Sequence, residues 1–237
     1  MLGDLYRMLD FSSWKTLTPE ASVRRIVQEP GVSENKKKFF SVQPGLWALT
    51  EYRDAVLKQF QLDGVDAETP DGSADEPTQT SQHAFNQRLI VEIGNMKEMR
   101  TIVASGDQNK ICLGKYLKDI MTLESIYEFG NPKHLDIARR IDVTWFKADE
   151  SPAAFFEVEH TTDIMNSLTK FHELQQYNAK FYIVAKEEKR GKFNAVLSKS
   201  VFRQLQGRVE FRSYDHIATQ YEVMSACVRE LAKIETI

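Results

Sequence analysis

Apolar residues recur at two different periods along the chain, and these periods outline its elements. Residues 84–104 carry Phe85, Leu89 and Ile93 at helical spacing, which predicts a helix. Two short apolar runs, residues 141–146 and 156–160, have the length and composition of strands. A turn-rich segment joins these runs, so we expect them to pair as a hairpin.

The rest of the pattern predicts a domain made of layered helices and strands. Residues 105–135 show only short helical pieces, around residues 113–123. The elements expected after the hairpin are a helix at about 162–177, a strand at 180–185, a short helix at 199–205, a strand at 209–212 and a C-terminal amphipathic helix at 215–235. Helices and strands that alternate in this way indicate an α/β fold.

A smaller unit precedes this domain. The Thr-Pro-Glu sequence at residues 18–20 has the features of a helix start, and the helix would continue to residue 28. Apolar runs at residues 39–42 and 46–49 flank a Pro-Gly turn, which predicts a strand, a turn and a strand. A helix followed by a hairpin is the second half of a winged helix.

Residues 61–82 separate the two parts. They contain six acidic and no basic residues and almost no large apolar side chain, so they predict an interdomain linker. This linker hides the mildly basic character of its flanks within a net charge of -3. The expected organisation is a small domain at 1–60, an acidic linker at 61–82 and an α/β domain at 83–237. Residues 180–208 carry eight basic groups, which either line phosphates or form a solvated face.

Composition narrows the class of protein. A hydrophobic content of 42 % is sufficient for a core, yet no apolar run approaches the roughly 20 residues that span a bilayer. The first residues lack a signal-peptide pattern. Cys112 and Cys227 are far apart and lack metal-site spacing, which favours two reduced thiols. We therefore expect a cytoplasmic protein.

Three carboxylates occupy the two runs of the predicted hairpin. Glu157 and Glu159 share one face of their strand because strand side chains alternate. A hairpin centred on residues 149–150 places Asp142 directly opposite Glu157, and opposed residues project to the same side. The three acids then converge, unless a bulge breaks the alternation.

Buried acids need a partner, and a divalent metal is one that suits this pattern. Carboxylate oxygens are the ligands that Mg²⁺ prefers, and such a site supports phosphodiester hydrolysis. The alternative is that these acids pair with Arg139, Arg140 or lysines on an exposed face. Glu92 lies on the helical stripe between Leu89 and Met96, where it either faces the site or pairs with Arg88 or Lys97.

These residues resemble the PD-(D/E)xK nuclease superfamily, the fold of many restriction endonucleases. In that family an Asp on one strand is followed on the next by Asp/Glu-x-Lys. Here Asp142 and the Glu157-Val158-Glu159 triplet carry the match, over roughly residues 83–213. The resemblance implies that Asp142, Glu157 and Glu159 bind Mg²⁺, with Mn²⁺ as a substitute, and that Glu92 supports the metal.

The triplet departs from the family pattern because glutamate replaces the lysine. Some restriction enzymes use Glu-x-Glu, in which a carboxylate activates the water. In others the following helix provides the lysine, and Lys170 is the candidate here, with His160 a weaker one. Gln175, Gln176 and Tyr177 resemble the glutamine and tyrosine that some branches place behind the site.

The N-terminal part resembles the winged-helix module shared by restriction endonucleases and some chromatin regulators, often called HARE-HTH. The match lies in residues 18–25 and 40–49. The resemblance places Ser22, Arg24 and Arg25 on or near the recognition helix. It places Lys36, Lys37 and Lys38 before the wing, where a solvated loop is the alternative. Only residues 2–9 remain for the helix that usually begins this module, so either the module is abbreviated or the chain is part of a longer one.

Together these features predict a Mg²⁺-dependent DNA endonuclease of the type II restriction class, with a winged helix that docks on double-stranded DNA. One site per chain favours a homodimer for cutting both strands, through the C-terminal helix 215–235. The alternatives are a non-catalytic DNA-binding regulator with a degenerate nuclease domain and a structure-specific repair nuclease.

Overall fold

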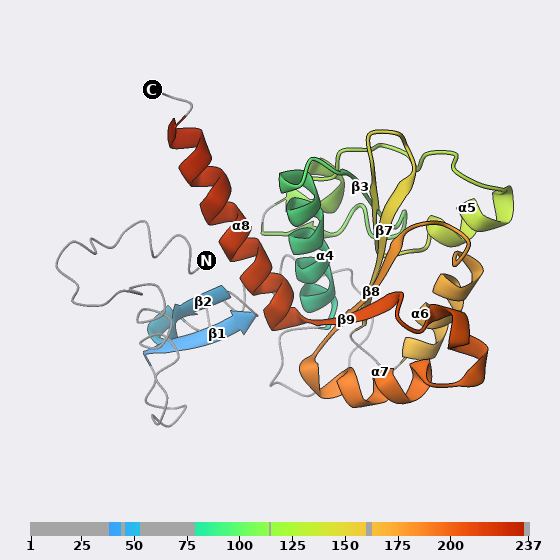
Figure 1. The fold of residues 1–237 in the computed structure, drawn as a ribbon. Coiled ribbons are helices and arrows are strands. Elements are labelled where there is room, and N and C mark those ends of the chain that lie inside the picture. The colour runs from blue at the N-terminus through green and yellow to red at the C-terminus, as the bar shows by residue number, and fades with distance from the viewer. Residues whose placement is uncertain (1–37, 44–45, 53–78, 114, 160–162, 235–237) are drawn as a thin grey trace.

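The computed structural model describes residues 38–43, 46–52, 79–113, 115–159 and 163–234 (Figure 1). Its helices and strands are β1 (Phe39–Gln43), β2 (Leu46–Leu49), η2 (Thr50–Tyr52), α4 (Gln79–Met96), β3 (Arg100–Val103), β4 (Ile111–Cys112), β5 (Lys115–Tyr116), η3 (Leu117–Asp119), α5 (Pro132–Ala138), β6 (Val143–Phe146), β7 (Pro152–Glu159), α6 (Ile164–Glu173), β8 (Lys180–Ala185), η4 (Glu187–Lys189), α7 (Arg190–Leu197), η5 (Ser200–Leu205), β9 (Val209–Ser213) and α8 (Tyr214–Ile234). None of the helices in these ranges has the length and apolarity needed to cross a bilayer.

A mixed five-stranded sheet forms the centre of the α/β domain, in the order β3-β6-β7-β8-β9. The first three strands are antiparallel neighbours, whereas β7, β8 and β9 run parallel. The parallel strands require crossover connections, and α6 and α7 lie in them. The predicted hairpin is therefore the middle of this sheet, at the change from antiparallel to parallel pairing.

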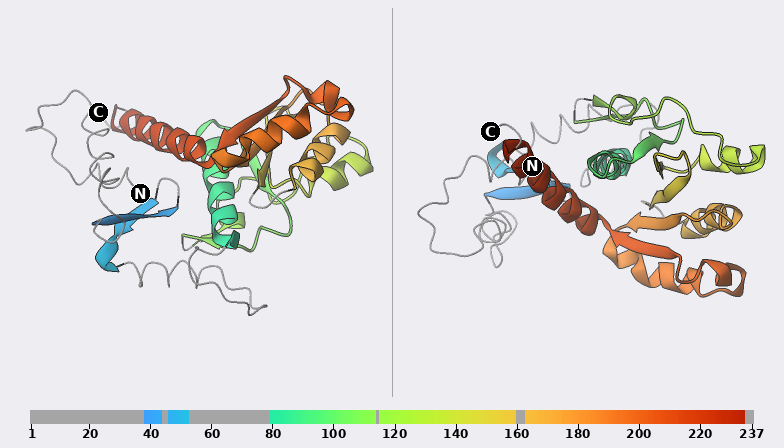
Figure 2. Two further views of the ribbon diagram at one scale, coloured as in Figure 1. Left: turned by 90° about the horizontal axis from the view of Figure 1, so that it is seen from below. Right: turned by 45° about the horizontal axis from the view of Figure 1, so that its top comes forward.

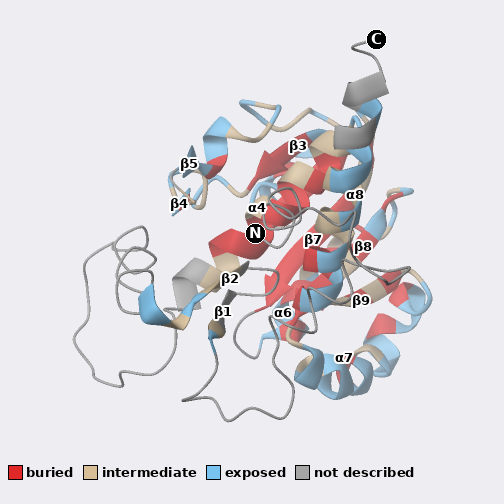
Figure 3. Cartoon of the chain, turned by 90° about the vertical axis from the view of Figure 1, so that its left-hand side faces the viewer, coloured by how far each residue is buried: buried red, intermediate tan, exposed pale blue. Residues whose placement is uncertain are grey.

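Helices cover both faces of the sheet (Figure 2). On one face α4 and α8 pack against Val143, Trp145 and Phe156. On the other face α5, α6 and α7 pack against Phe155 and Phe181. Neighbouring residues Phe155 and Phe156 thus enter opposite cores, as strand alternation requires, and both cores are solidly buried (Figure 3).

The predicted C-terminal end of the helix at residues 84–104 is wrong. Helix α4 stops at Met96, and β3 takes up Val103. Glu98 adopts a left-handed backbone with φ of 59°, and the Met99 N–H donates to the Gly94 carbonyl at 3.0 Å. These are the features of a helix-terminating motif, which an apolar stripe does not reveal. Helix α4 also begins at Gln79, inside the segment predicted as linker.

Two further differences concern short elements. Where short helical pieces were predicted around residues 113–123, the structure has the 3-10 helix η3, and the short strand β5 precedes it. Helix α7 was not anticipated, because it has only eight residues and Gly191 and Asn194 are poor helix formers. The strand at 180–185 and the hairpin β1-β2 occur where the pattern predicts them. The predicted helix at residues 18–28 lies outside the described residues, so the winged helix stays a prediction.

Candidate functional site

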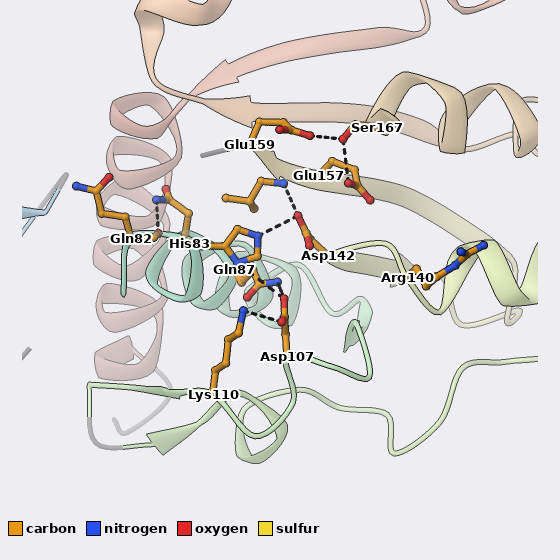
Figure 4. A network of polar contacts seen from close by, with 12 residues as sticks. Gln82, His83, Gln87, Asp107, Lys110, Arg140, Asp142, Glu157, Glu159 and Ser167 are labelled. Atoms are coloured by element: carbon orange, nitrogen blue, oxygen red, sulfur yellow. Dashed lines mark hydrogen bonds and ion pairs between the residues drawn. The ribbon is translucent and has the colours of Figure 1, made fainter. Parts of the chain in front are cut away.

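The predicted hairpin brings the acidic residues to one end of the sheet. Val143 pairs with Phe156, and Thr144 pairs with Phe155. Asp142 directly precedes β6, so this register places it opposite Glu157. A register shift does occur, but it lies at Phe146, at the far end of the hairpin. The alternation is therefore intact at the acids, and Figure 4 shows Asp142, Glu157 and Glu159 grouped together.

Glu157 and Glu159 are buried and share a single hydroxyl. Glu157 is 3 % exposed and Glu159 is 8 % exposed. The Ser167 hydroxyl on α6 lies 3.0 Å from Glu157 Oε2 and also contacts Glu159 Oε1. One hydroxyl has one hydrogen to donate, so a proton on one of the two carboxyl groups would allow both contacts to be full hydrogen bonds.

Electrostatics favour such a proton. Burial, and secondarily the charge of Asp142, raise the pKa of Glu157 to about 8. Burial likewise raises the pKa of Glu159, against the lowering effect of the Ser167 hydrogen bond. Removing water disfavours the charged carboxylate, and a neighbouring negative charge adds to the effect. A cation at this site would replace the proton.

Lys170 reaches the same site from α6. Its Nζ lies 2.9 Å from both carboxylate oxygens of Glu157 and donates to the Arg140 carbonyl at 3.1 Å. A lysine from the following helix therefore stands beside the acids, although the strand itself carries glutamate at the corresponding position. This positive charge is the nearest partner of Glu157.

Two residues at the site were not anticipated from the sequence. His83, on α4, lies 3.2 Å through Nε2 from Asp142 Oδ2, which also accepts from the Val158 N–H at 2.7 Å. A hydrogen bond between His83 and Asp142 requires the hydrogen on Nε2. His83 Nδ1 is then buried without a hydrogen-bond partner among the described residues, 3.8 Å from Asp107 Oδ2.

Asp107 is held in place as an anion. Lys110 Nζ lies 2.7 Å from its Oδ1, and Gln87 Nε2 donates to its Oδ2 at 2.5 Å. Burial alone would raise its pKa, but the hydrogen bonds from Lys110 and Gln87 outweigh burial and lower the pKa of Asp107. His83 and Asp107 thus fix the side of Asp142 that faces away from the glutamates (Figure 4).

The donor set fits a divalent cation. Ligand atoms of His83, Asp107 and Asp142 all lie within 4.8 Å of one another, and the imidazole includes the unpaired Nδ1. Glu157 and Glu159 add carboxylate oxygens on the opposite side of Asp142. Carboxylates suit Mg²⁺, whereas an imidazole ligand favours Mn²⁺ and later transition metals. The residues present therefore fit either metal.

Glu92 is not part of this cluster. It accepts a hydrogen bond from Arg88 Nε at 2.9 Å and lies beside Tyr221 of α8. Nine residues of helix separate it from His83, which corresponds to about 13 Å along α4. Of the two roles expected for Glu92, the structure therefore agrees with the pairing with Arg88.

The other predicted residues lie elsewhere. Tyr177 and Gln176 contact His134 Nδ1 at 2.8 and 2.9 Å, and Gln175 contacts His172, so none of the three contacts the carboxylates. Lys38 is exposed at the start of the β1-β2 hairpin, where its carbonyl accepts from the Thr50 N–H. The predicted residues that lie outside the described ranges are Ser22, Arg24, Arg25, Lys36, Lys37 and His160.

Comparison with known proteins adds a family. Residues 64–235 match the family model of the type II restriction enzyme NmeDI C-terminal domain. The chain is 25 % identical over 204 residues to the type II restriction enzyme NmeDI of Neisseria meningitidis serogroup C, over 75 % of this chain and 56 % of the relative. The chain thus spans about half the length of this curated relative. No solved structure matches.

Proposed function

The chain belongs to the family of the type II restriction enzyme NmeDI C-terminal domain, and from this premise we propose that it is a DNA endonuclease of the restriction class. The observation that carries the proposal is the meeting of Asp142, Glu157 and Glu159 with Lys170 at one end of a mixed sheet. The element order around this hairpin supports a PD-(D/E)xK fold for the domain.

Asp142 and Glu157 would hold Mg²⁺ or Mn²⁺, with Glu159 as a third ligand or as the group that orients water. When bound, such a cation polarises a phosphoryl oxygen and lowers the pKa of bound water. The raised pKa values of Glu157 and Glu159 mean that metal binding must displace a proton. Metal affinity should therefore rise with pH near neutrality.

Each remaining residue has a role that follows from its contacts. Burial raises the pKa of Glu159, which lies next to the proposed metal ligands. Glu159 would therefore accept the proton of the attacking water. Lys170 would offset the charge that develops on the phosphate, from its position on Glu157. His83 would orient Asp142 through a hydrogen bond from Nε2, as the hydrogen-bond partners of metal ligands commonly do.

Recognition of double-stranded DNA would involve the N-terminal part. We propose that Ser22, Arg24 and Arg25 contact DNA from a winged helix, and that Lys36, Lys37 and Lys38 lie along its approach. Cutting both strands would use a homodimer. These proposals rest on the sequence resemblance alone.

The test is cleavage of plasmid DNA, with and without modified bases, in Mg²⁺ or Mn²⁺. We expect discrete fragments from the wild-type protein and none from Asp142→Asn. The matched control is Asp136→Asn, the same change at an exposed aspartate paired with Arg139, which should cut normally. Equal cutting by both variants would refute the proposed site.

One observation favours a second function, that of a non-catalytic DNA-binding regulator. Glu159 stands where the family pattern has lysine, and Lys170 donates to Glu157 rather than approaching the site from β7. DNA binding without cleavage of any substrate in either metal would establish this alternative. Preference for branched over linear DNA would instead indicate a repair nuclease.

A further inference from the structure

His83 lies between two aspartates and contacts them through different ring nitrogens (Figure 4). Its Nε2 lies 3.2 Å from Asp142 Oδ2, and its Nδ1 lies 3.8 Å from Asp107 Oδ2. The first distance is that of a hydrogen bond, whereas the second is too long for one. Nδ1 is buried and has no hydrogen-bond partner in the part of the chain that the structure describes. Because burying an unpaired polar atom is costly, this nitrogen is suited to a ligand.

Gln87 presents a second unpaired acceptor one turn further along α4. Side chains four residues apart lie on the same face of a helix, so Gln87 and His83 project to the same side. Gln87 is 0 % exposed, and its Nε2 donates to Asp107 Oδ2 at 2.5 Å. Its Oε1 is buried and lacks a partner among the described residues. An imidazole nitrogen and an amide oxygen, both able to bind a cation, therefore lie beside one carboxylate.

The charge around these two atoms favours a cation. Lys110 Nζ lies 2.7 Å from Asp107 Oδ1, so the ammonium group occupies one carboxylate oxygen and leaves the other on the side of His83. Ligand atoms of His83, Asp107 and Asp142 lie within 4.8 Å of one another. Two carboxylates thus flank a neutral imidazole, against the single ammonium group of Lys110.

The hydrogen bonds around His83 and Asp107 are those of metal ligands. A histidine that binds a metal through one nitrogen usually donates its other N–H to a carboxylate, as His83 does to Asp142. A carboxylate that binds a metal is usually hydrogen-bonded as well, as Asp107 is by Gln87. Two ligand atoms at about 2.1 Å from one cation lie roughly 3.0 to 3.4 Å apart in octahedral or tetrahedral geometry. The 3.8 Å gap therefore closes onto an ion with a shift of less than about 1 Å.

We propose that His83 Nδ1, Asp107 Oδ2 and Gln87 Oε1 bind a transition-metal dication, Mn²⁺ or Zn²⁺, at a site separate from the carboxylates of Glu157 and Glu159. A ligand set that includes imidazole favours these ions over Mg²⁺, which prefers oxygen ligands alone. The bound ion fixes the tautomer of His83 and strengthens its Nε2–H as a donor to Asp142. It therefore holds Asp142 from the side opposite the glutamates.

The experiment counts the Mn²⁺ ions bound to the full chain by electron paramagnetic resonance and uses pulsed measurements to detect nitrogen coordinated to them. His83→Gln and Asp107→Asn each remove one ligand of the proposed site. Glu157→Gln/Glu159→Gln removes the carboxylates of the other site. The matched control is Asp136→Asn, the same change at an exposed aspartate paired with Arg139.

We expect the wild type and Asp136→Asn to bind two Mn²⁺ ions per chain, one of them with nitrogen coupling. His83→Gln and Asp107→Asn should lose the coupling and bind this ion at least about tenfold more weakly. Glu157→Gln/Glu159→Gln should keep the coupling. In the wild type, excess Mg²⁺ should displace the uncoupled ion first, a measurement that does not depend on the folding of any variant.

A wild type without nitrogen coupling, as a protonated His83 or a bridging water molecule would give, overturns the proposal. Coupling that survives in Asp107→Asn at unchanged affinity overturns it as well, provided that circular dichroism shows the variant to be folded.

The inference does not depend on DNA cleavage, which is a separate readout. A wild type that cuts DNA in Mg²⁺ but shows no nitrogen coupling would keep the nuclease proposal and refute this site. A wild type that shows the coupling but never cuts would keep the site and refute the nuclease.

Discussion

The proton held by the buried glutamate pair makes the stability of the metal-free protein depend on pH. The pKa of Glu157 is about 8 in the folded protein and 4.5 when unperturbed. Between these values the folded state binds more protons than the unfolded state, so the free energy of unfolding falls as pH rises. The stabilisation is fully present below about pH 4.5 and is lost as pH passes about 8.

The magnitude follows from linkage. One bound proton changes the free energy of unfolding by about 1.4 kcal/mol per pH unit, or roughly 3 kcal/mol between pH 5 and 7. Glu157 is only 3 % exposed, so solvent screening reduces this figure little. Glu157→Gln keeps the shape and carries no charge at any pH, so this contribution to the pH dependence should disappear.

Urea unfolding in EDTA, followed by tryptophan fluorescence from pH 5 to 8, measures the effect. The stability of Glu157→Gln should rise relative to wild type as pH increases. The control Glu173→Gln changes an exposed acid whose pKa the Lys133 hydrogen bond lowers, so it should not diverge from wild type in this window. Parallel curves for wild type and Glu157→Gln would refute a shared buried proton.

Three further predictions concern packing, metal binding and catalysis. A Cβ at Gly94 would lie 2.6 Å from Trp145 Nε1, so Gly94→Ala should destabilise by about 1–3 kcal/mol in urea, whereas Gly106→Ala, with open space around it, should not. His83→Ala should weaken Mn²⁺ binding about 10- to 100-fold by calorimetry, and unchanged affinity would exclude a role in positioning Asp142. Lys170→Met removes a charge that lowers the pKa of Glu157, so single-turnover cleavage should become slower and shift to higher pH; an unshifted pH profile would contradict this.

The local pattern of apolar residues in the sequence determined how the acidic residues of the hairpin face one another. Alternation along two strands joined by a short turn leaves few registers that bury the apolar side chains, so Asp142 had to lie opposite Glu157. Buried strand β8 and amphipathic helix α8 could be predicted from the sequence for the same reason. These features depend on residues that are close in sequence.

Only the tertiary structure decided which helical residues reach that end. His83 and Asp142 are separated by 59 residues, and their contact depends on how α4 lies across the sheet. The absence of a side chain at Gly94 allows α4 to approach Trp145 closely. This placement sets His83 against Asp142 and carries Glu92 about two and a half turns away, toward α8. The period of a helix reveals which of its faces is buried, but the position along the helix that meets a carboxylate is set by packing between distant segments.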